Sequence, residues 1–131
     1  LLSGDLRPRM VEVLRHCKEH FSVGCITNNV KSGTGPGMAR DNARADAVQA
    51  VMDLFDLVVE SSVEGIRKPD PRIYRLACDR LGVDPARTVF LDDLGINLKP
   101  ARALGMQTIK VVDEDQAIEA LYAVTGLPSR V

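Results

Sequence analysis

The sequence has no Trp, and aromatic residues of all kinds make up only 4% of its 131 residues. We therefore expect a hydrophobic core built from Val, Leu, Ile, Ala and Met. The formal net charge is −1 at pH 7, and no run of Lys or Arg is present. Nucleic acids and anionic membranes attract proteins through such basic runs, so we predict neither as a partner. A locally positive site that binds phosphate is still compatible with this balance.

Long apolar stretches and a signal sequence are also missing from residues 1–131. No stretch approaches the roughly 20 apolar residues that a membrane-spanning helix needs, and the first residues lack the charged start of a signal peptide. The 3 Cys residues lie far apart and match no metal-ligand spacing. Such a sparse, odd set indicates reduced thiols in or beside the core, and we predict a cytoplasmic protein. Because the first residue is not Met, we expect the chain to begin inside a longer polypeptide.

Helix-like and strand-like segments alternate along the whole chain. The expected strands are residues 22–27, 56–60, 88–91 and 107–112. The expected helices are residues 7–20, 38–53 and 96–104, one from an Asp70 cap to Gly82, and one from an Asp113–Gln116 capping box to Gly126. The strands are near-continuous runs of Val, Ile and Leu, which is typical of strands that are covered on both faces. We predict one α/β domain with a parallel sheet over residues 1–131.

Polar side chains follow three of the expected strands. Thr27 and Asn28 end the first strand, Lys68 lies in the loop after the second, and Asp92 and Asp93 end the third. Ligands of open parallel sheets bind beyond the carboxyl ends of the strands, so we expect these side chains to share one edge. Hydroxyl, amide and ammonium groups can bind phosphoryl oxygens, and carboxylates can hold a hard divalent cation. The pattern favours a phosphate site beside a metal ion.

Three segments carry a resemblance to a known family. Residues 26–28, 65–74 and 89–101 resemble motifs two, three and four of the haloacid dehalogenase superfamily, in the right order and at strand ends. The last segment is most similar to the phosphatase-like domain of soluble epoxide hydrolases and to related acyl-CoA-dehydrogenase-linked domains. The resemblance implies a Rossmann-like three-layer sandwich. It also implies a magnesium-dependent phosphatase that acts on a small phosphorylated substrate through an aspartyl-phosphate.

The resemblance also assigns roles to the residues that bind the phosphoryl group. Thr27 and Asn28 occupy the positions that would bind the transferring group. Lys68 occupies the position of the catalytic lysine, which stabilises negative charge on the nucleophile and on the phosphate. A phosphatase suits this set better than a dehalogenase does, because an aspartate pair and a lysine suit magnesium and phosphate.

The metal site is implied in the same way. Asp93 would ligate Mg²⁺, and Asp92 would support the ion through a water or from outside its coordination sphere. Asn97, near the start of the following helix, would help to order the loop that contains the two aspartates. We therefore expect Thr27, Lys68 and Asp93 to face one shared pocket.

The family's first motif has no counterpart in residues 1–131. That motif is an Asp-x-Asp on the opening strand, and its first Asp is the nucleophile. The only such spacing here, residues 113–115, follows the last strand and fits a helix cap. The cap domain of the family is missing as well. We predict a partial core, inactive by itself, whose central strand comes from an upstream segment or a partner chain. Residues 22–27 and 88–91 should flank an empty position roughly 10 Å wide rather than pair directly.

Other interpretations compete with an enzyme. The chain could be a non-catalytic fragment or pseudoenzyme that serves for binding within a larger protein. The Gly-rich residues 33–37 suggest a dinucleotide site, but Met38 stands where the third Gly belongs, so we expect a surface loop. His16 and His20 have the spacing of two metal ligands on a helix. No third ligand accompanies them, and we expect an ordinary exposed pair.

Overall fold

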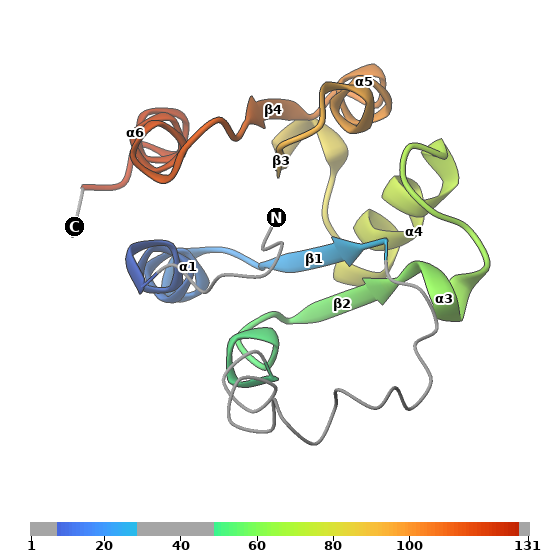
Figure 1. The fold of residues 1–131 in the computed structure, drawn as a ribbon, viewed down its shortest axis with the longest axis horizontal. Helices are drawn as coiled ribbons and strands as arrows, with labels where there is room; N and C mark the ends of the chain where they lie inside the picture. The colour runs from blue at the N-terminus through green and yellow to red at the C-terminus, as the bar shows by residue number, and fades with distance from the viewer. Residues whose placement is uncertain (1–7, 29–48, 129–131) are drawn as a thin grey trace, which may run out of the picture.

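The computed structural model describes residues 8–28 and 49–128, and helices and strands alternate along both segments (Figure 1). The elements are α1 (Pro8–His20), β1 (Gly24–Thr27), β2 (Leu57–Glu60), α3 (Ser61–Glu64), α4 (Pro71–Leu81), the 3₁₀-helix η2 (Pro85–Arg87), β3 (Val89–Asp92), α5 (Gly95–Ala103), β4 (Gln107–Lys110) and α6 (Glu114–Thr125). The predicted α/β class is confirmed. Among the described residues, no helix is both long and apolar enough to cross a membrane.

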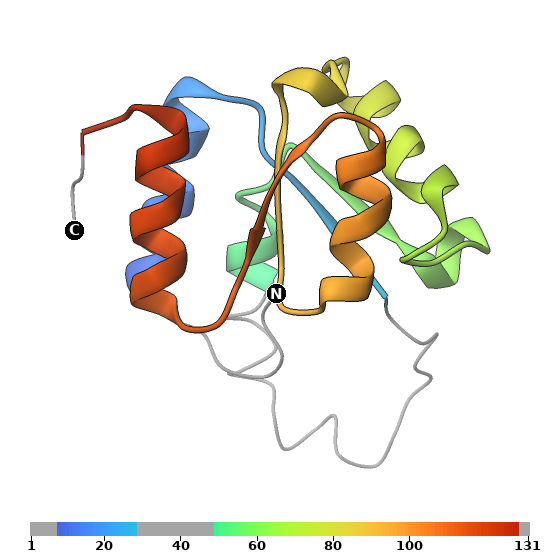
Figure 2. The same ribbon diagram turned by 90° about the horizontal axis from the view of Figure 1, so that it is seen from above.

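The strands form two separate parallel pairs. β1 pairs with β2 from Gly24 opposite Leu57 onward, and β3 pairs with β4 from Val89 opposite Gln107 onward. Within the described residues, β1 and β3 share no ladder. Seen from above, the strands run the same general way, each turned relative to the next (Figure 2). Such a turn between neighbouring strands is the twist expected of parallel strands.

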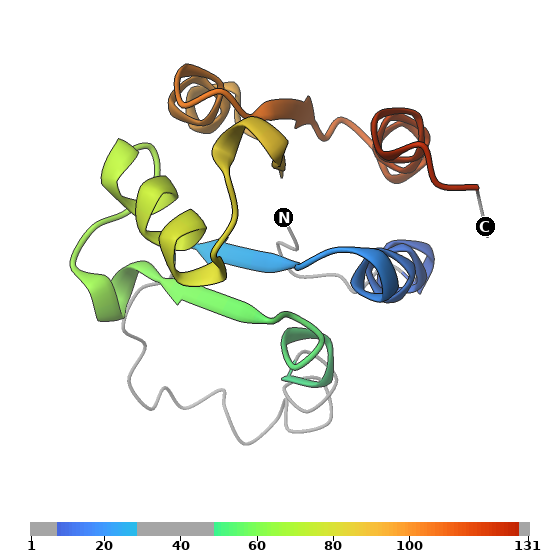
Figure 3. The same cartoon turned by 180° about the vertical axis from the view of Figure 1, so that it is seen from behind.

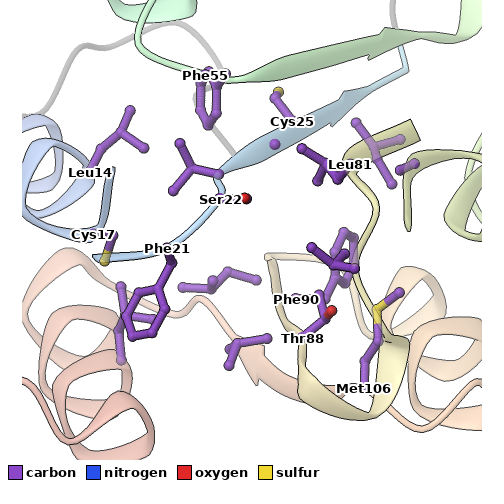
Figure 4. A pocket seen from close by; sticks show the side chains of 18 of the residues that line it. Leu14, Cys17, Phe21, Ser22, Cys25, Phe55, Leu81, Thr88, Phe90 and Met106 are labelled. Carbon is purple, nitrogen blue, oxygen red and sulfur yellow. The ribbon is translucent and has the colours of Figure 1, made fainter. Parts of the chain in front are cut away.

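A cavity of about 600 Å³ fills this interruption. Cys25 and Ile26 of β1 line it from one side, and Phe90 and Leu91 of β3 line it from the other. Figure 4 shows apolar side chains from both strand pairs and from the helices pointing into it. As predicted, residues 22–27 and 88–91 do not pair directly within the described parts of the chain, and the missing central strand stays a prediction.

Helices cover both faces of the strands. α1 and α6 pack on one face, and α4 and α5 pack on the other (Figures 2 and 3). Each helix pair encloses its own hydrophobic cluster. The buried members near α4 and α5 are Val59, Ile73, Tyr74, Ala77, Cys78, Ala101 and Met106. Those near α1 and α6 are Val13, Cys17, Ile109, Ile118, Leu121 and Tyr122.

The helix ends follow the sequence signals closely. Asp70 caps α4 by accepting a hydrogen bond from the Arg72 N–H at 3.0 Å, and Gly82 ends the helix with a φ of 70°. Asp113 caps α6 by accepting from the Gln116 N–H at 2.8 Å. The Gln116 side chain accepts from the Val112 N–H at 3.0 Å and not from the cap residue, so the expected capping box is only half formed.

Several strand boundaries differ from the prediction. β3 extends to Asp92, whose backbone pairs with Lys110, and β4 stops there because its partner strand ends. The loop predicted before Lys68 contains the short helix α3. The predicted Gly-rich loop lies outside the described residues, as does most of the predicted helix 38–53.

One prediction about α1 is wrong. His16 is not exposed: only 3% of it is accessible, and its Nδ1 shares a 2.9 Å hydrogen bond with the Tyr122 hydroxyl. The reason is that α6 packs on that side of α1. Phe21 lies past the end of the helix and is 46% exposed. The three cysteines are free and lie in or beside the core, as predicted.

Candidate active site

Asn28 fixes the backbone of Lys68. Its Oδ1 accepts from the Lys68 N–H at 2.8 Å, and its Nδ2 donates to the Lys68 carbonyl at 3.0 Å. A side-chain amide can bond to a peptide unit in this two-point manner because it carries a donor and an acceptor side by side. The end of β1 and the loop before α4, 40 residues apart in sequence, are thereby held together.

Lys68 and Asp92 form a buried ion pair. The Lys68 Nζ lies 2.8 Å from the Asp92 Oδ2, and the two side chains are 9% and 3% exposed. The ammonium also lies 5.9 Å from the centre of the Phe90 ring, within the range of a cation–π contact. A charge this deeply buried stays ionised only when partners surround it.

Asp92 accepts hydrogen bonds on both of its oxygens. Oδ1 accepts from the Leu94 N–H at 2.9 Å, and the Asn97 side-chain amide lies 3.3 Å from both oxygens. Burial acts to raise the pKa of Asp92, but the hydrogen bonds from Lys68, Leu94 and Asn97 and the charge of Lys68 outweigh it and lower the pKa. Asp92 is therefore an anion at neutral pH.

Asp93 and Thr27 flank this network along the chain. Asp93 is exposed and directly follows Asp92, and Thr27 is half-buried at the end of β1 directly before Asn28. The structure thus joins Asn28, Lys68, Asp92 and Asn97 by hydrogen bonds. The roles of all six predicted residues, and the shared pocket of Thr27, Lys68 and Asp93, stay predictions.

Two aromatic residues that sequence reasoning did not assign to the site support it. Phe90 of β3 lies under the Lys68 ammonium. The Tyr74 ring packs edge-on against the Phe90 ring, with 5.2 Å between the two ring centroids. Tyr74 ends the family-like segment 65–74, but no role was assigned to it from the sequence. The sequence feature that could have pointed to Tyr74 is its hydroxyl group, because the chain has only 2 Tyr residues.

The described residues provide only part of a metal site. No group of three or more His, Cys, Asp or Glu side chains that could hold a metal ion occurs in the described parts of the chain. Asp93 offers an exposed carboxylate, the ligand type that magnesium prefers, while the Asp92 oxygens already accept from protein donors. A bound Mg²⁺ would need further ligands from elsewhere.

The cavity between β1 and β3 ends at this network, because Lys68 is one of its lining residues. Most of its other lining side chains are apolar, including those of Ile26, Phe90 and Leu91. An apolar wall does not suit a phosphate group, so the cavity itself is not the anion site. The polar cluster at its end is the candidate.

Comparison with known proteins identifies the same family. The family model for haloacid dehalogenase-like hydrolases matches residues 1–105. Bifunctional epoxide hydrolase 2 of Sus scrofa is 41% identical over 120 residues, which cover 92% of this chain and 21% of that protein. Acyl-CoA dehydrogenase family member 10 of Mus musculus is 54% identical over 74 residues, covering 56% of this chain and 7% of that protein. The predicted resemblance to these two groups is confirmed.

Two further relatives are a phosphatase and a solved structure. A phosphatase of Mycobacterium tuberculosis is 32% identical over 107 residues, covering 82% of this chain and 45% of that protein. A haloacid dehalogenase family enzyme of Bacteroides thetaiotaomicron, solved as a magnesium complex, superposes with a TM-score of 0.65 at 26% identity. That match covers 82% of this chain and 53% of the other. The chain spans less than half the length of each of the three sequence relatives.

Proposed function

The chain belongs to the haloacid dehalogenase-like hydrolase family, and on this basis we propose that it is the core of a magnesium-dependent phosphatase whose nucleophilic Asp lies outside residues 1–131. The buried pair of Lys68 and Asp92 at the strand ends, 2.8 Å apart, carries the proposal. An ammonium has three N–H groups, and Asp92 accepts one of them. The other two can donate to a nucleophilic carboxylate and to a phosphoryl oxygen, whose negative charge they stabilise.

The neighbouring residues bind the phosphoryl group or hold other site residues in place. The Thr27 hydroxyl binds a phosphoryl oxygen at the end of β1. Asn28 acts there mainly through Lys68, because both polar atoms of its side-chain amide hold the Lys68 backbone. Asn97 and Asp92 keep the loop after β3 in place, so that Asp93 stays directed to solvent.

Asp93 is the residue of this chain that would hold Mg²⁺, which supplies positive charge to the phosphoryl oxygens when bound. The solved relative from Bacteroides thetaiotaomicron is a magnesium complex. Hard carboxylate oxygens fit that ion, although the described residues alone provide too few of them. The remaining ligands belong, in this proposal, to the segment that also brings the nucleophile.

That segment enters the position between β1 and β3. Both strands are parallel members of their pairs, and among the residues that the structure describes each has one neighbouring strand. Their second edges face the cavity of about 600 Å³. An added strand would satisfy the unpaired backbone groups of both edges, and its carboxyl end would reach Lys68. An upstream segment of the same polypeptide or a partner chain supplies it.

The reaction is hydrolysis of a small phosphate monoester. A carboxylate oxygen of the nucleophilic Asp bonds to phosphorus while the phosphorus–oxygen ester bond breaks, and the leaving alkoxide takes up a proton. Water then attacks the phosphorus of the aspartyl-phosphate, which releases inorganic phosphate and restores the carboxylate. The aspartate pair and the buried lysine, which suit magnesium and phosphate, favour this choice over dehalogenation. The free cysteines support a reducing, cytoplasmic environment.

A phosphatase assay of the polypeptide at its full natural length tests the proposal. With a small aryl phosphate as substrate, we expect turnover that needs magnesium and that is lost in Asp93→Asn. Asp79→Asn, which neutralises an exposed acid on α4, is the matched control and should leave turnover unchanged. Absence of turnover in a folded, full-length protein would instead favour the non-catalytic binding module.

A further inference from the structure

The Lys68–Asp92 pair is tied to the interior of the domain through Asn97. The Asn97 side chain reaches back to Asp92, 3.3 Å away, and Asn97 itself is 4% exposed. Its backbone carbonyl accepts a second, shorter hydrogen bond, from the Tyr74 hydroxyl at 2.6 Å. Asn97, near the start of α5, therefore accepts a hydrogen bond from α4 and donates one to the end of β3.

Tyr74 is the most deeply buried member of this chain of contacts. Its accessible surface is 0%, and its ring packs against Phe90, which also lies under the Lys68 ammonium. Lys68 and Tyr74 are six residues apart on one segment, whose turn into α4 is capped by Asp70. The hydrogen bonds from Tyr74 through Asn97 and Asp92 to Lys68 thus form a closed ring together with the backbone between Lys68 and Tyr74.

We propose that Tyr74 is a positioning residue, which acts through Asn97 to hold the Asp92 carboxylate, and with it the Lys68 ammonium, at the carboxyl end of β3. Its hydroxyl stays a donor at every physiological pH, because burial and the charge of Asp92 raise the pKa of Tyr74 to about 12. A phenylalanine would fill the same volume without making the bond to Asn97.

The second Tyr of the chain provides a matched control. Tyr122 is also buried, and its hydroxyl also makes one hydrogen bond, of 2.9 Å to His16 Nδ1. It belongs to the cluster between α1 and α6, away from Lys68. Tyr74→Phe and Tyr122→Phe therefore remove the same atom from comparable surroundings, and only the first removal cuts the connection to Asp92.

The first readout is structural and needs no activity. The Lys68 ammonium is buried and hydrogen-bonded, so its N–H signal should be visible in a ¹H–¹⁵N NMR spectrum of the full-length protein. We expect Tyr74→Phe to broaden that signal by speeding exchange with water, and Tyr122→Phe to leave it as in the wild type. Equal signals in the two folded variants would overturn the proposal.

The second readout is kinetic and rests on the proposed phosphatase function. We expect Tyr74→Phe to lower kcat about tenfold with KM within about twofold of the wild type, because one positioning hydrogen bond is lost. Tyr122→Phe should change neither constant by more than about twofold. An equal loss of kcat in both variants would mean that Tyr74 is merely structural. A wild type without turnover would count against the phosphatase and leave the NMR result to decide on Tyr74.

Asn97→Ala keeps the test decisive if Tyr74→Phe does not fold. This variant retains the backbone carbonyl that Tyr74 binds and removes only the amide that reaches Asp92. We expect the Lys68 signal to broaden in the same way. A Lys68 signal unchanged by Asn97→Ala would show that the chain of contacts does not position the pair.

Discussion

Four other residues arrange the nearly closed surroundings of Lys68. Asn28 holds its backbone, Asp92 neutralises it, Asn97 orients Asp92 and the Phe90 ring lies under the ammonium. Such an arrangement is costly to assemble and is weak evidence for stability by itself. It is the expected structure of a site that keeps a positive charge ready for an incoming anion.

Removing Lys68 should leave Asp92 as a lone buried charge. We expect Lys68→Met to lower the free energy of unfolding by roughly 3–5 kcal/mol. Lys68→Met combined with Asp92→Asn should cost less than Lys68→Met alone, because no unpaired charge remains. Urea denaturation measures all of these. Arg80→Met, which breaks an exposed pair with Glu64, serves as the control and should change stability far less. A double variant less stable than the single one would contradict this description.

The pH dependence of stability should carry the signature of Asp92. Its pKa is lowered in the folded protein, so between the folded and unfolded pKa values the unfolded chain binds more protons. The contribution of Asp92 is therefore fully present above an unfolded pKa of about 3.9 and is lost as the pH falls through the lower, folded value. We expect the stability difference between the wild type and the Lys68→Met, Asp92→Asn double variant to shrink below about pH 4. A difference independent of pH in acid would argue against an ionised Asp92.

At the scale of elements, the helix ends obey short-range rules. Asp113 precedes α6, and its side chain accepts from the Gln116 N–H at 2.8 Å, which satisfies one of the first free amides of the helix. We expect Asp113→Ala to lower the free energy of unfolding by about 1 kcal/mol, and Asp113→Asn to retain most of the stability. Thermal denaturation of the two variants side by side checks this, and equal losses would contradict the capping role.

Short-range signals explain why much of the fold was predictable from the sequence. The caps of α4 and α6, the apolar strands and the order of polar residues at strand ends each depend on a few neighbouring residues. The burial of His16 depends instead on α6, which lies about a hundred residues later, and no local pattern encodes that contact. The helix α3 escaped prediction because it is only 4 residues long and lacks a side-chain cap.

The candidate site was predictable in its members but not in its connections. Asn28, Lys68, Asp92 and Asn97 were singled out from the sequence, and the structure joins them. That Asn28 uses its amide on the Lys68 backbone follows only from three-dimensional packing. The bond from Tyr74 to Asn97 likewise joins two helices whose approach no sequence pattern specifies.

For the whole molecule, the interrupted sheet is the dominant feature. Within residues 8–28 and 49–128, β1 and β3 each pair on one edge, and an apolar cavity lies between them. Unpaired strand edges in the middle of a sheet cost free energy and promote aggregation. Helices nevertheless lie on both faces of the two strand pairs (Figure 2). The arrangement fits a domain whose sheet would be completed by one more strand.

Hydrogen exchange can detect that strand directly. In a parallel sheet, successive backbone amides of a strand point to opposite edges. In residues 1–131 alone, we expect the amides of β1 and β3 that face the cavity to exchange fast. In the polypeptide at its full length the same amides should be protected, while the interface between β1 and β2 stays protected in both. Full protection of both edges in residues 1–131 alone would mean that no strand is missing.

The central claim is that the attacking carboxylate comes from outside this chain, and phosphate-ester turnover by residues 1–131 tests it most directly. The measurement compares this fragment, shown by circular dichroism to be folded, with the full-length polypeptide, both with magnesium and a small aryl phosphate. We predict turnover by the full-length protein and none above background by the fragment, because its own buried Asp92 is held by Lys68, Leu94 and Asn97 and cannot attack phosphorus. Robust magnesium-dependent turnover by residues 1–131 alone, abolished by Asp93→Ala, would contradict the claim.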